Sequence, residues 1–137
     1  MSTLIANTAI IIGGLLSFAL AIYHCTFYHI FKWNDEFQKI SVLNARIFMT
    51  LHIGLIAVFM FFSFLSFVYT KELGQCNGLA GVIIGFYAFV WLFRTIWQVT
   101  YLRVLHSEKP FSHYVFTVWF FLLFVAYSIP VVVNLSR

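Results

Sequence analysis

The chain has 137 residues, of which 63% are hydrophobic and only 9% are charged, with a formal net charge of +4. A soluble domain carries roughly 25% charged residues, and a soluble fold this short could not bury so much apolar surface. Four segments lack any Asp, Glu, Lys or Arg, and each is long enough to cross a bilayer, which takes about 20 residues of helix. These segments are 1–31, 47–70, 73–93 and 110–136.

The four apolar segments predict an integral membrane protein with an all-α fold, formed by one membrane domain over residues 1–137. Strands exposed to lipid would need a closed barrel with alternating polarity, and these runs are continuously apolar. We therefore expect a four-transmembrane-helix antiparallel bundle in which consecutive helices pack as neighbours, because their connections are short. The expected helices span residues of about 4–24, 47–69, 79–102 and 114–133.

The segment between the first two spans has a helical pattern of its own. Ile30, Trp33, Phe37 and Ile40 recur at spacings of three and four residues. This spacing is typical of a short amphipathic helix that lies in the headgroup plane, with Trp33 as an interfacial anchor. We expect such an interfacial segment between the first and second membrane helices.

Basic residues predict the orientation of the bundle. Four spans place both termini on one side and the loops after the first and third spans on the other. Positively charged loops stay in the cytoplasm, so we expect cytoplasmic loops and extracytoplasmic termini. The scattered basic residues form no stripe for nucleic acid and suit lipid headgroups. The loop side holds Lys32, Lys39, Arg46, Arg103 and Lys109, and the terminal side holds Lys71 and Arg137.

Small residues at intervals of about one helical turn mark two packing seams, where backbones can approach closely. Each seam either lies inside the bundle or joins two subunits, and Gly81 with Gly85 is the candidate surface of a homodimer. The first seam is Gly13, Ser17 and Ala21, and the second is Gly81, Gly85 and Ala88.

All five histidines map to the predicted cytoplasmic side. Imidazole is a common metal ligand, and two histidines on facing helices can hold a haem iron. His52 is the first candidate because it lies inside the hydrocarbon, about 9 Å beyond Arg46 by helix rise. A second ligand would be His24, His106 or His113. The alternatives are interfacial or capping imidazoles at the helix ends and an interhelical hydrogen bond at His52.

Arg94 is a charged residue deep within a span. It lies about 13 Å from Arg103 by helix rise, close to the midplane of a hydrocarbon core of about 30 Å. A guanidinium there costs at least about 2.5 kcal/mol on insertion scales, and no Asp or Glu lies within any span. We expect its partner to be a carbonyl, a hydroxyl, water, or a ligand with an anionic or carbonyl group. The alternative is an arginine that only joins helices or extends to the interface.

Helical spacing places Arg94 on a polar and aromatic face of the third span, which we expect to turn inward as a ligand site. His52 lies about 4–5 Å shallower than Arg94 by the same helix rise. We therefore expect the two to line one cavity if the second and third spans are neighbours. The residues of this face are Tyr87, Trp91, Arg94, Gln98 and Tyr101.

Three functions remain open on these observations. The first is a small protein that binds haem b, another metal or quinone, with His52 and a second histidine as ligands and Arg94 facing a propionate or a quinone carbonyl. The second is an accessory or scaffold subunit of a larger membrane complex, without a ligand of its own. The third is a dimeric carrier or lipid- or anion-binding protein, in which Arg94, Gln98 and Tyr101 hold an anionic group. A non-enzymatic role is favoured, because the chain has neither a nucleophile-elbow serine nor an intramembrane acid.

Overall fold

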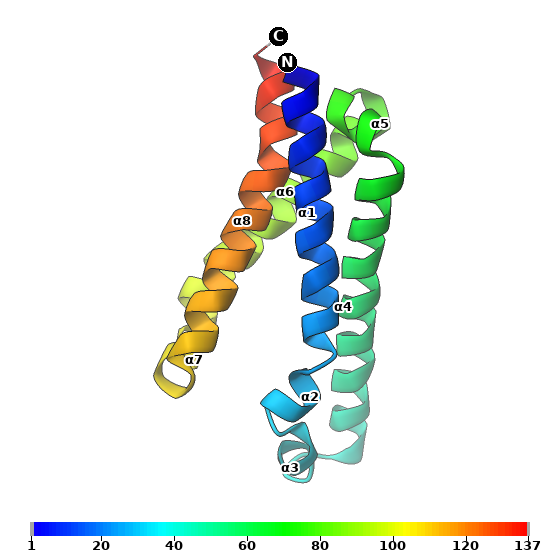
Figure 1. Cartoon of the computed structure of the whole chain (residues 1–137). Coiled ribbons are helices and arrows are strands. Elements are labelled where there is room, and N and C mark those ends of the chain that lie inside the picture. The colour runs from blue at the N-terminus through cyan, green and yellow to red at the C-terminus, as the bar shows by residue number, and fades with distance from the viewer. Residues whose placement is uncertain (1, 137) are drawn as a thin grey trace.

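The computed structural model describes residues 2–136, so Arg137 of the charge count lies outside the described part. Consecutive long helices run antiparallel to one another (Figure 1). Each is long and apolar enough to cross a membrane, which confirms the predicted all-α four-helix bundle and makes the chain a multi-pass membrane protein. The long helices are α1 (Ser2–His24), α4 (Val42–Val68), α6 (Gly78–Thr100) and α8 (Pro110–Leu135).

Short helical segments connect the long ones at the two ends of the bundle. Both termini lie beside α5, whereas α2, α3 and α7 lie at the opposite end (Figure 1). The termini therefore lie at one end of the bundle and the loops after the first and third spans at the other, as expected. Which of these ends faces the cytoplasm stays a prediction. The short segments are α2 (Phe27–Ile30), α3 (Trp33–Phe37), α5 (Thr70–Gln75), the 3₁₀ turn η1 (Tyr101–Arg103) and α7 (Val104–Glu108).

The interfacial segment after α1 is helical but not continuous. Lys32 adopts a left-handed conformation with φ of 51° between α2 and α3. A left-handed residue interrupts the hydrogen-bond ladder of a right-handed helix. The expected segment between the first two membrane helices is thus present as two short helices, because the chain turns at Lys32 and α3 ends at Phe37, before Ile40.

Two helices begin earlier than predicted, and each has a local cause. Ser41 precedes α4, and its Oγ accepts a hydrogen bond from the backbone N–H of Asn44 at 3.2 Å. Such a cap satisfies one of the unpaired donors of the first helical turn. α8 begins at Pro110, where proline fits the first turn because its missing N–H is not needed there.

The four helices are not all packed equally closely on their neighbours in sequence. α1 packs on both α4 and α8, and α8 packs on α6. The backbones of α4 and α6 make few close contacts. The two helices meet instead through stacked rings, with ring centres 3.8 Å apart for Phe62 and Tyr87 and 5.4 Å apart for Phe59 and Trp91. The second and third spans are thus neighbours through their side chains, as their short connection predicts, although their backbones do not approach as closely as those of the other consecutive helices.

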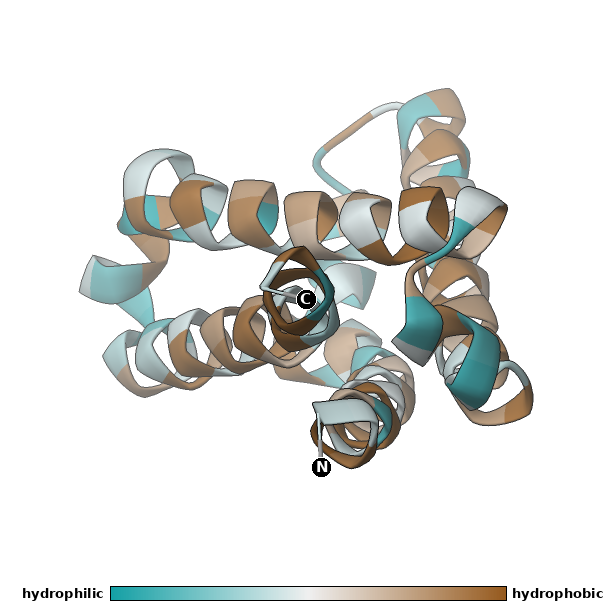
Figure 2. Ribbon diagram, turned by 90° about the horizontal axis from the view of Figure 1, so that it is seen from above, coloured by the Kyte–Doolittle hydropathy of each residue, from teal (hydrophilic) through white to brown (hydrophobic). Residues whose placement is uncertain are grey.

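The α6–α8 hairpin diverges from the α1–α4 hairpin toward the end that carries α2, α3 and α7 (Figure 1). Seen from above, hydrophobic residues lie on the outward as well as the inward faces of the long helices (Figure 2). An apolar outer surface of this kind is expected for helices immersed in lipid.

The first small-residue seam packs inside the bundle. A Cβ atom at Gly13 would lie 2.7 Å from Cζ of Tyr127, so only glycine allows this ring to approach α1 so closely. The Tyr127 hydroxyl lies 3.2 Å from Ser17 Oγ and 2.9 Å from Ser66 Oγ, which links α1, α4 and α8. By contrast, a Cβ at Gly85 would meet no described atom within 4 Å. The proposed dimer through the second seam stays a prediction.

Candidate functional site

Arg94 occupies the face of α6 that packs against α8, and its side chain is partly buried. Its Nη1 donates to Oε1 of Gln98 at 3.1 Å, one helical turn away. Its Cζ lies 4.4 Å above the centre of the Phe120 ring. No acidic side chain of residues 2–136 forms an ion pair with Arg94. Among residues 2–136 the guanidinium therefore has one neutral acceptor and one aromatic face, which leaves most of its five N–H donors available.

Gln98 joins Arg94 to a histidine of α8. The amide is fully buried, and its Nε2 lies 3.4 Å from Nδ1 of His113. Since the amide nitrogen can only donate, Nδ1 of His113 is the acceptor in this hydrogen bond. The His113 ring lies 5.4 Å from that of the exposed His106. A polar chain thus runs from Arg94 through Gln98 and His113 to the surface at α7.

Trp91 and Tyr87 belong to the aromatic core on the same face of α6. Trp91 stacks on Phe120 at 5.9 Å, so Trp91 and Arg94 contact the same ring. Within the described part of the chain, Trp91 Nε1 and the Tyr87 hydroxyl are buried without a hydrogen-bond partner. A buried donor without a partner costs about 1–3 kcal/mol. Both donors thus retain hydrogen-bonding capacity that a bound molecule or a water would use.

Tyr101 does not belong to this site. Its side chain is 68% exposed and stacks on the ring of Trp97 at 4.5 Å. The expected inward orientation was wrong because α6 ends at Thr100 and Tyr101 begins the 3₁₀ turn η1. A 3₁₀ turn has about 3.0 residues per turn instead of 3.6, so the α-helical spacing no longer applies.

His24 and His52 form a pair on the other hairpin. Nε2 of His52 donates to the backbone carbonyl of His24 at 3.0 Å, and Nδ1 of His24 donates to the carbonyl of Leu20 at 2.9 Å. The two imidazole rings are 5.7 Å apart. His52 thus makes the interhelical hydrogen bond that was the alternative to metal ligation.

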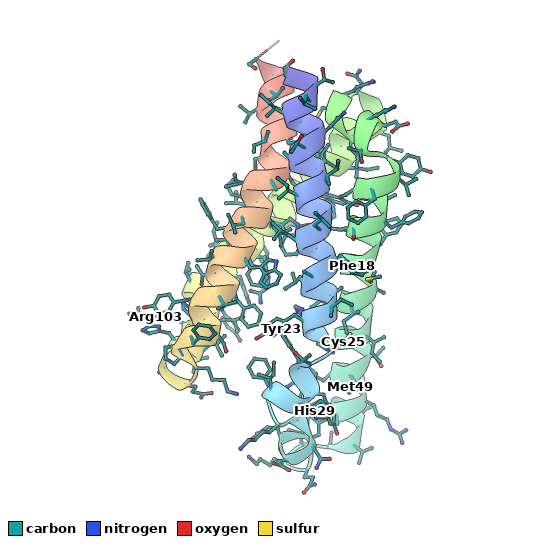
Figure 3. All side chains as sticks on the ribbon, in the orientation of Figure 1. Phe18, Tyr23, Cys25, His29, Met49 and Arg103 are labelled. Atoms are coloured by element: carbon teal, nitrogen blue, oxygen red, sulfur yellow. The ribbon has the colours of Figure 1, made fainter. Side chains whose placement is uncertain are left out.

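Aromatic rings separate this pair from Arg94. Phe27 lies 4.2 Å from the His24 ring and 5.5 Å from Phe116, which in turn stacks on Phe120 at 5.8 Å. Tyr23 extends from α1 toward α8 in the same region (Figure 3). Arg94 and His52 therefore lie toward the same end of the bundle without touching.

The histidine pair does not fit haem in this arrangement. An axial pair must direct one free nitrogen from each ring at an iron that lies between them in a macrocycle. Phe27 and Phe59 pack on the His24 ring at 4.2 and 4.9 Å, and Trp33 packs on the His52 ring at 4.6 Å. These rings fill the space that a porphyrin would need. Among residues 2–136, no group of three or more His, Cys, Asp and Glu could hold a metal ion, so His106 and His113 form only a pair.

Two contacts at this end of the bundle were not predicted from the sequence. Phe120 follows His113 by seven residues, a spacing that places both on one face of α8, so this contact of Arg94 was open to prediction. Lys109 connects the hairpins, because its Nζ donates to the carbonyl of Ile30 at 2.7 Å and lies 5.1 Å from the Phe31 ring. No local pattern predicts a bond between residues so far apart in sequence.

Comparison with known proteins gives no relative for this chain. No family model, no curated protein and no solved structure matches it. Function must therefore be argued from the site itself. Residues 2–136 form a multi-pass α-helical membrane protein whose interior holds an arginine with no carboxylate partner.

Proposed function

We propose that this membrane protein binds an anionic amphiphile, with the headgroup on Arg94 and the hydrocarbon tail among the membrane helices. The headgroup is a carboxylate or a phosphate. The observation that carries the proposal is that Arg94 faces Gln98 and Phe120 and has no anion among the described residues.

Energetics favour a bound anion at this position. An arginine near the centre of a membrane helix costs at least about 2.5 kcal/mol. The single neutral hydrogen bond to Gln98 offsets about 0.6 kcal/mol of this, the mean for such bonds inside membranes. The Phe120 ring contributes about 0.5–2 kcal/mol as a cation–π partner. An anion would use the remaining donors of Arg94 and neutralise its charge.

The chemistry of the surrounding groups suits an oxyanion. A guanidinium presents parallel N–H groups that match both oxygens of a carboxylate or phosphate. Gln98 holds the guanidinium from one side through Oε1. Trp91, which shares Phe120 with Arg94, has an unpaired Nε1 donor. Tyr87 lies one turn deeper on the same face and adds a second unpaired donor.

The divergence of the two hairpins supports an approach from the end that carries α7 (Figure 1). Among the described residues, the contacts that bridge the hairpins in this region include ring contacts and side-chain hydrogen bonds, one of them from Trp119 Nε1 to the carbonyl of Leu16 at 3.2 Å. Tyr23 packs on Phe116 and Trp119 at 5.6 and 6.3 Å, and Lys109 bonds to Ile30. Side chains of this kind can rotate without breaking the backbone ladder of either hairpin.

The proposal is tested by measuring the affinity of the full chain, in neutral detergent, for three probes. Oleate carries a carboxylate, lysophosphatidate carries a phosphate, and methyl oleate is an uncharged ester with the same chain as oleate. Hydrogen bonds to a charged group contribute about 1.5–3 kcal/mol, so we expect at least one anionic probe to bind about 10- to 100-fold more tightly than the ester.

Two variants assign that preference to a residue. Arg94→Gln removes the charge and should bring the affinity for the anionic probe down to that for methyl oleate. Arg103→Gln removes an exposed arginine from η1 and should keep the preference. The proposal is wrong if wild type binds all three probes equally, or if Arg94→Gln retains the preference. Either result would favour an accessory role without a ligand.

A further inference from the structure

A second candidate site lies at the opposite end of the bundle, between α4 and α6. A groove of about 610 Å³ lies there, and residues of α5 contribute to its lining. This volume lies within the range of about 300–1,000 Å³ of small-molecule sites. The groove is lined by Phe61, Phe62, Leu65, Tyr69, Glu72, Leu73, Leu79, Ala80, Val82, Ile83, Phe86 and Tyr87.

The walls of the groove suit a hydrocarbon chain. Apart from Glu72 and the two tyrosine hydroxyls, its lining side chains are aliphatic or phenyl. Phe61 and Phe86, from the two facing helices, are 57% and 55% exposed. These helices are long and apolar enough to span a membrane, so the groove opens on lipid, and an acyl chain is the molecule that matches its surface.

The outer end of the groove carries charge. Glu72 is the one acidic residue in its lining, is exposed, and has no ion pair within residues 2–136. Lys71 precedes it on α5 and is also exposed. Adjacent residues on a helix do not face each other, so the carboxylate and the ammonium group are both free to meet a ligand. A carboxylate and an ammonium group on successive residues of α5 complement a headgroup that carries an ammonium and a phosphate.

We propose that the groove between α4 and α6 binds a phospholipid with a primary ammonium headgroup. An acyl chain lies between Phe61 and Phe86, the ammonium donates to the Glu72 carboxylate, and the phosphate lies toward Lys71. This site shares no charged residue with the Arg94 site and does not depend on it.

The test offers the full chain in neutral detergent an equimolar mixture of dioleoyl phosphatidylethanolamine and dioleoyl phosphatidylcholine. Native mass spectrometry then counts the lipids that stay bound. The two lipids share tails, phosphate and net charge, but the choline nitrogen has no N–H to donate to Glu72. An exposed charge pair supports roughly a two- to fivefold preference for the ethanolamine lipid.

Three variants identify the groove and its carboxylate. Glu72→Gln should reduce the preference to about one, whereas Glu108→Gln, which removes an acid from α7, should keep it. Ala80→Phe fills the groove and should reduce the binding of both lipids, with circular dichroism to establish that the helices are intact. The proposal is overturned if wild type takes up both lipids equally or if the preference survives Glu72→Gln. Oleate binding at Arg94 should be unchanged in Glu72→Gln, so the two proposals fail separately.

Discussion

Replacing Arg94 with methionine distinguishes an arginine that binds a ligand from one that only joins helices. Methionine keeps an unbranched, flexible side chain but removes the charge. The variant loses the 3.1 Å bond to Gln98 and the contact with the Phe120 ring. These are worth about 0.6 kcal/mol and about 0.5–2 kcal/mol. It also avoids at least about 2.5 kcal/mol of charge insertion.

With the charge cost taken at its lower bound of about 2.5 kcal/mol, the difference between these terms predicts that Arg94→Met leaves the free energy of unfolding unchanged or raises it, by about 1.4 kcal/mol where the Phe120 contact is weak. The measurement is unfolding in mixed micelles by titration with dodecyl sulfate, followed by circular dichroism. Arg103→Met serves as the matched control, since Arg103 is exposed in η1. The lipid-free protein must be used, because a bound anion would stabilise wild type alone.

A loss of more than about 2 kcal/mol in Arg94→Met would refute this reasoning, since the terms above predict essentially no loss of stability. Such a loss would mean that Arg94 is a structural contact between α6 and α8. A stable Arg94→Met protein that also loses its preference for an anionic probe would show that the arginine is kept for binding at some cost to the fold.

Three further predictions concern the core and the histidines. Gly13→Ala would place a Cβ 2.7 Å from Cζ of Tyr127. In the same unfolding assay it should therefore destabilise the fold by about 1–3 kcal/mol. Gly85→Ala is the control and should not destabilise the fold, because a Cβ there has no described atom within 4 Å. Tyr127→Phe removes a hydroxyl that meets two serine hydroxyls at 3.2 and 2.9 Å. It should lower the free energy of unfolding by about 1 kcal/mol, at about 0.6 kcal/mol per bond. Tyr114→Phe, on the exposed side of α8, should leave the free energy of unfolding unchanged. Protein purified from haem-replete cells should show no Soret band, and a band that disappears in His52→Ala would contradict the packing argument at the histidine pair.

The sequence predicts the four spans because charged residues are absent from long segments, and hydropathy alone detects this. It also predicts the close approach at Gly13, since small residues one turn apart mark helix contacts in membranes. Arg94 and Gln98 were expected to face inward, and both contact residues of α8. That expectation followed from the cost of exposing a guanidinium to lipid.

Hydropathy does not predict which helices meet. Lipid and protein core are equally apolar, so an apolar face does not reveal its neighbour. The separation of α4 and α6 depends on where the Phe59, Phe62, Tyr87 and Trp91 rings stack, which is a property of the whole bundle. Tyr101 escaped prediction because the α-helical spacing ends at η1.

The most direct test of anion binding at Arg94 is a magnetic-resonance measurement of the bound headgroup. Oleate with a ¹³C-labelled carboxylate is added to protein with ¹⁵N-labelled arginine in bilayers, and the dipolar coupling between carboxylate carbon and guanidinium nitrogen is recorded. A direct contact, with nitrogen and oxygen about 2.7–2.9 Å apart, predicts a strong coupling in wild type that Arg94→Lys abolishes and Arg103→Lys preserves. A coupling that persists in Arg94→Lys, or that is absent from wild type saturated with oleate, would contradict carboxylate binding at Arg94.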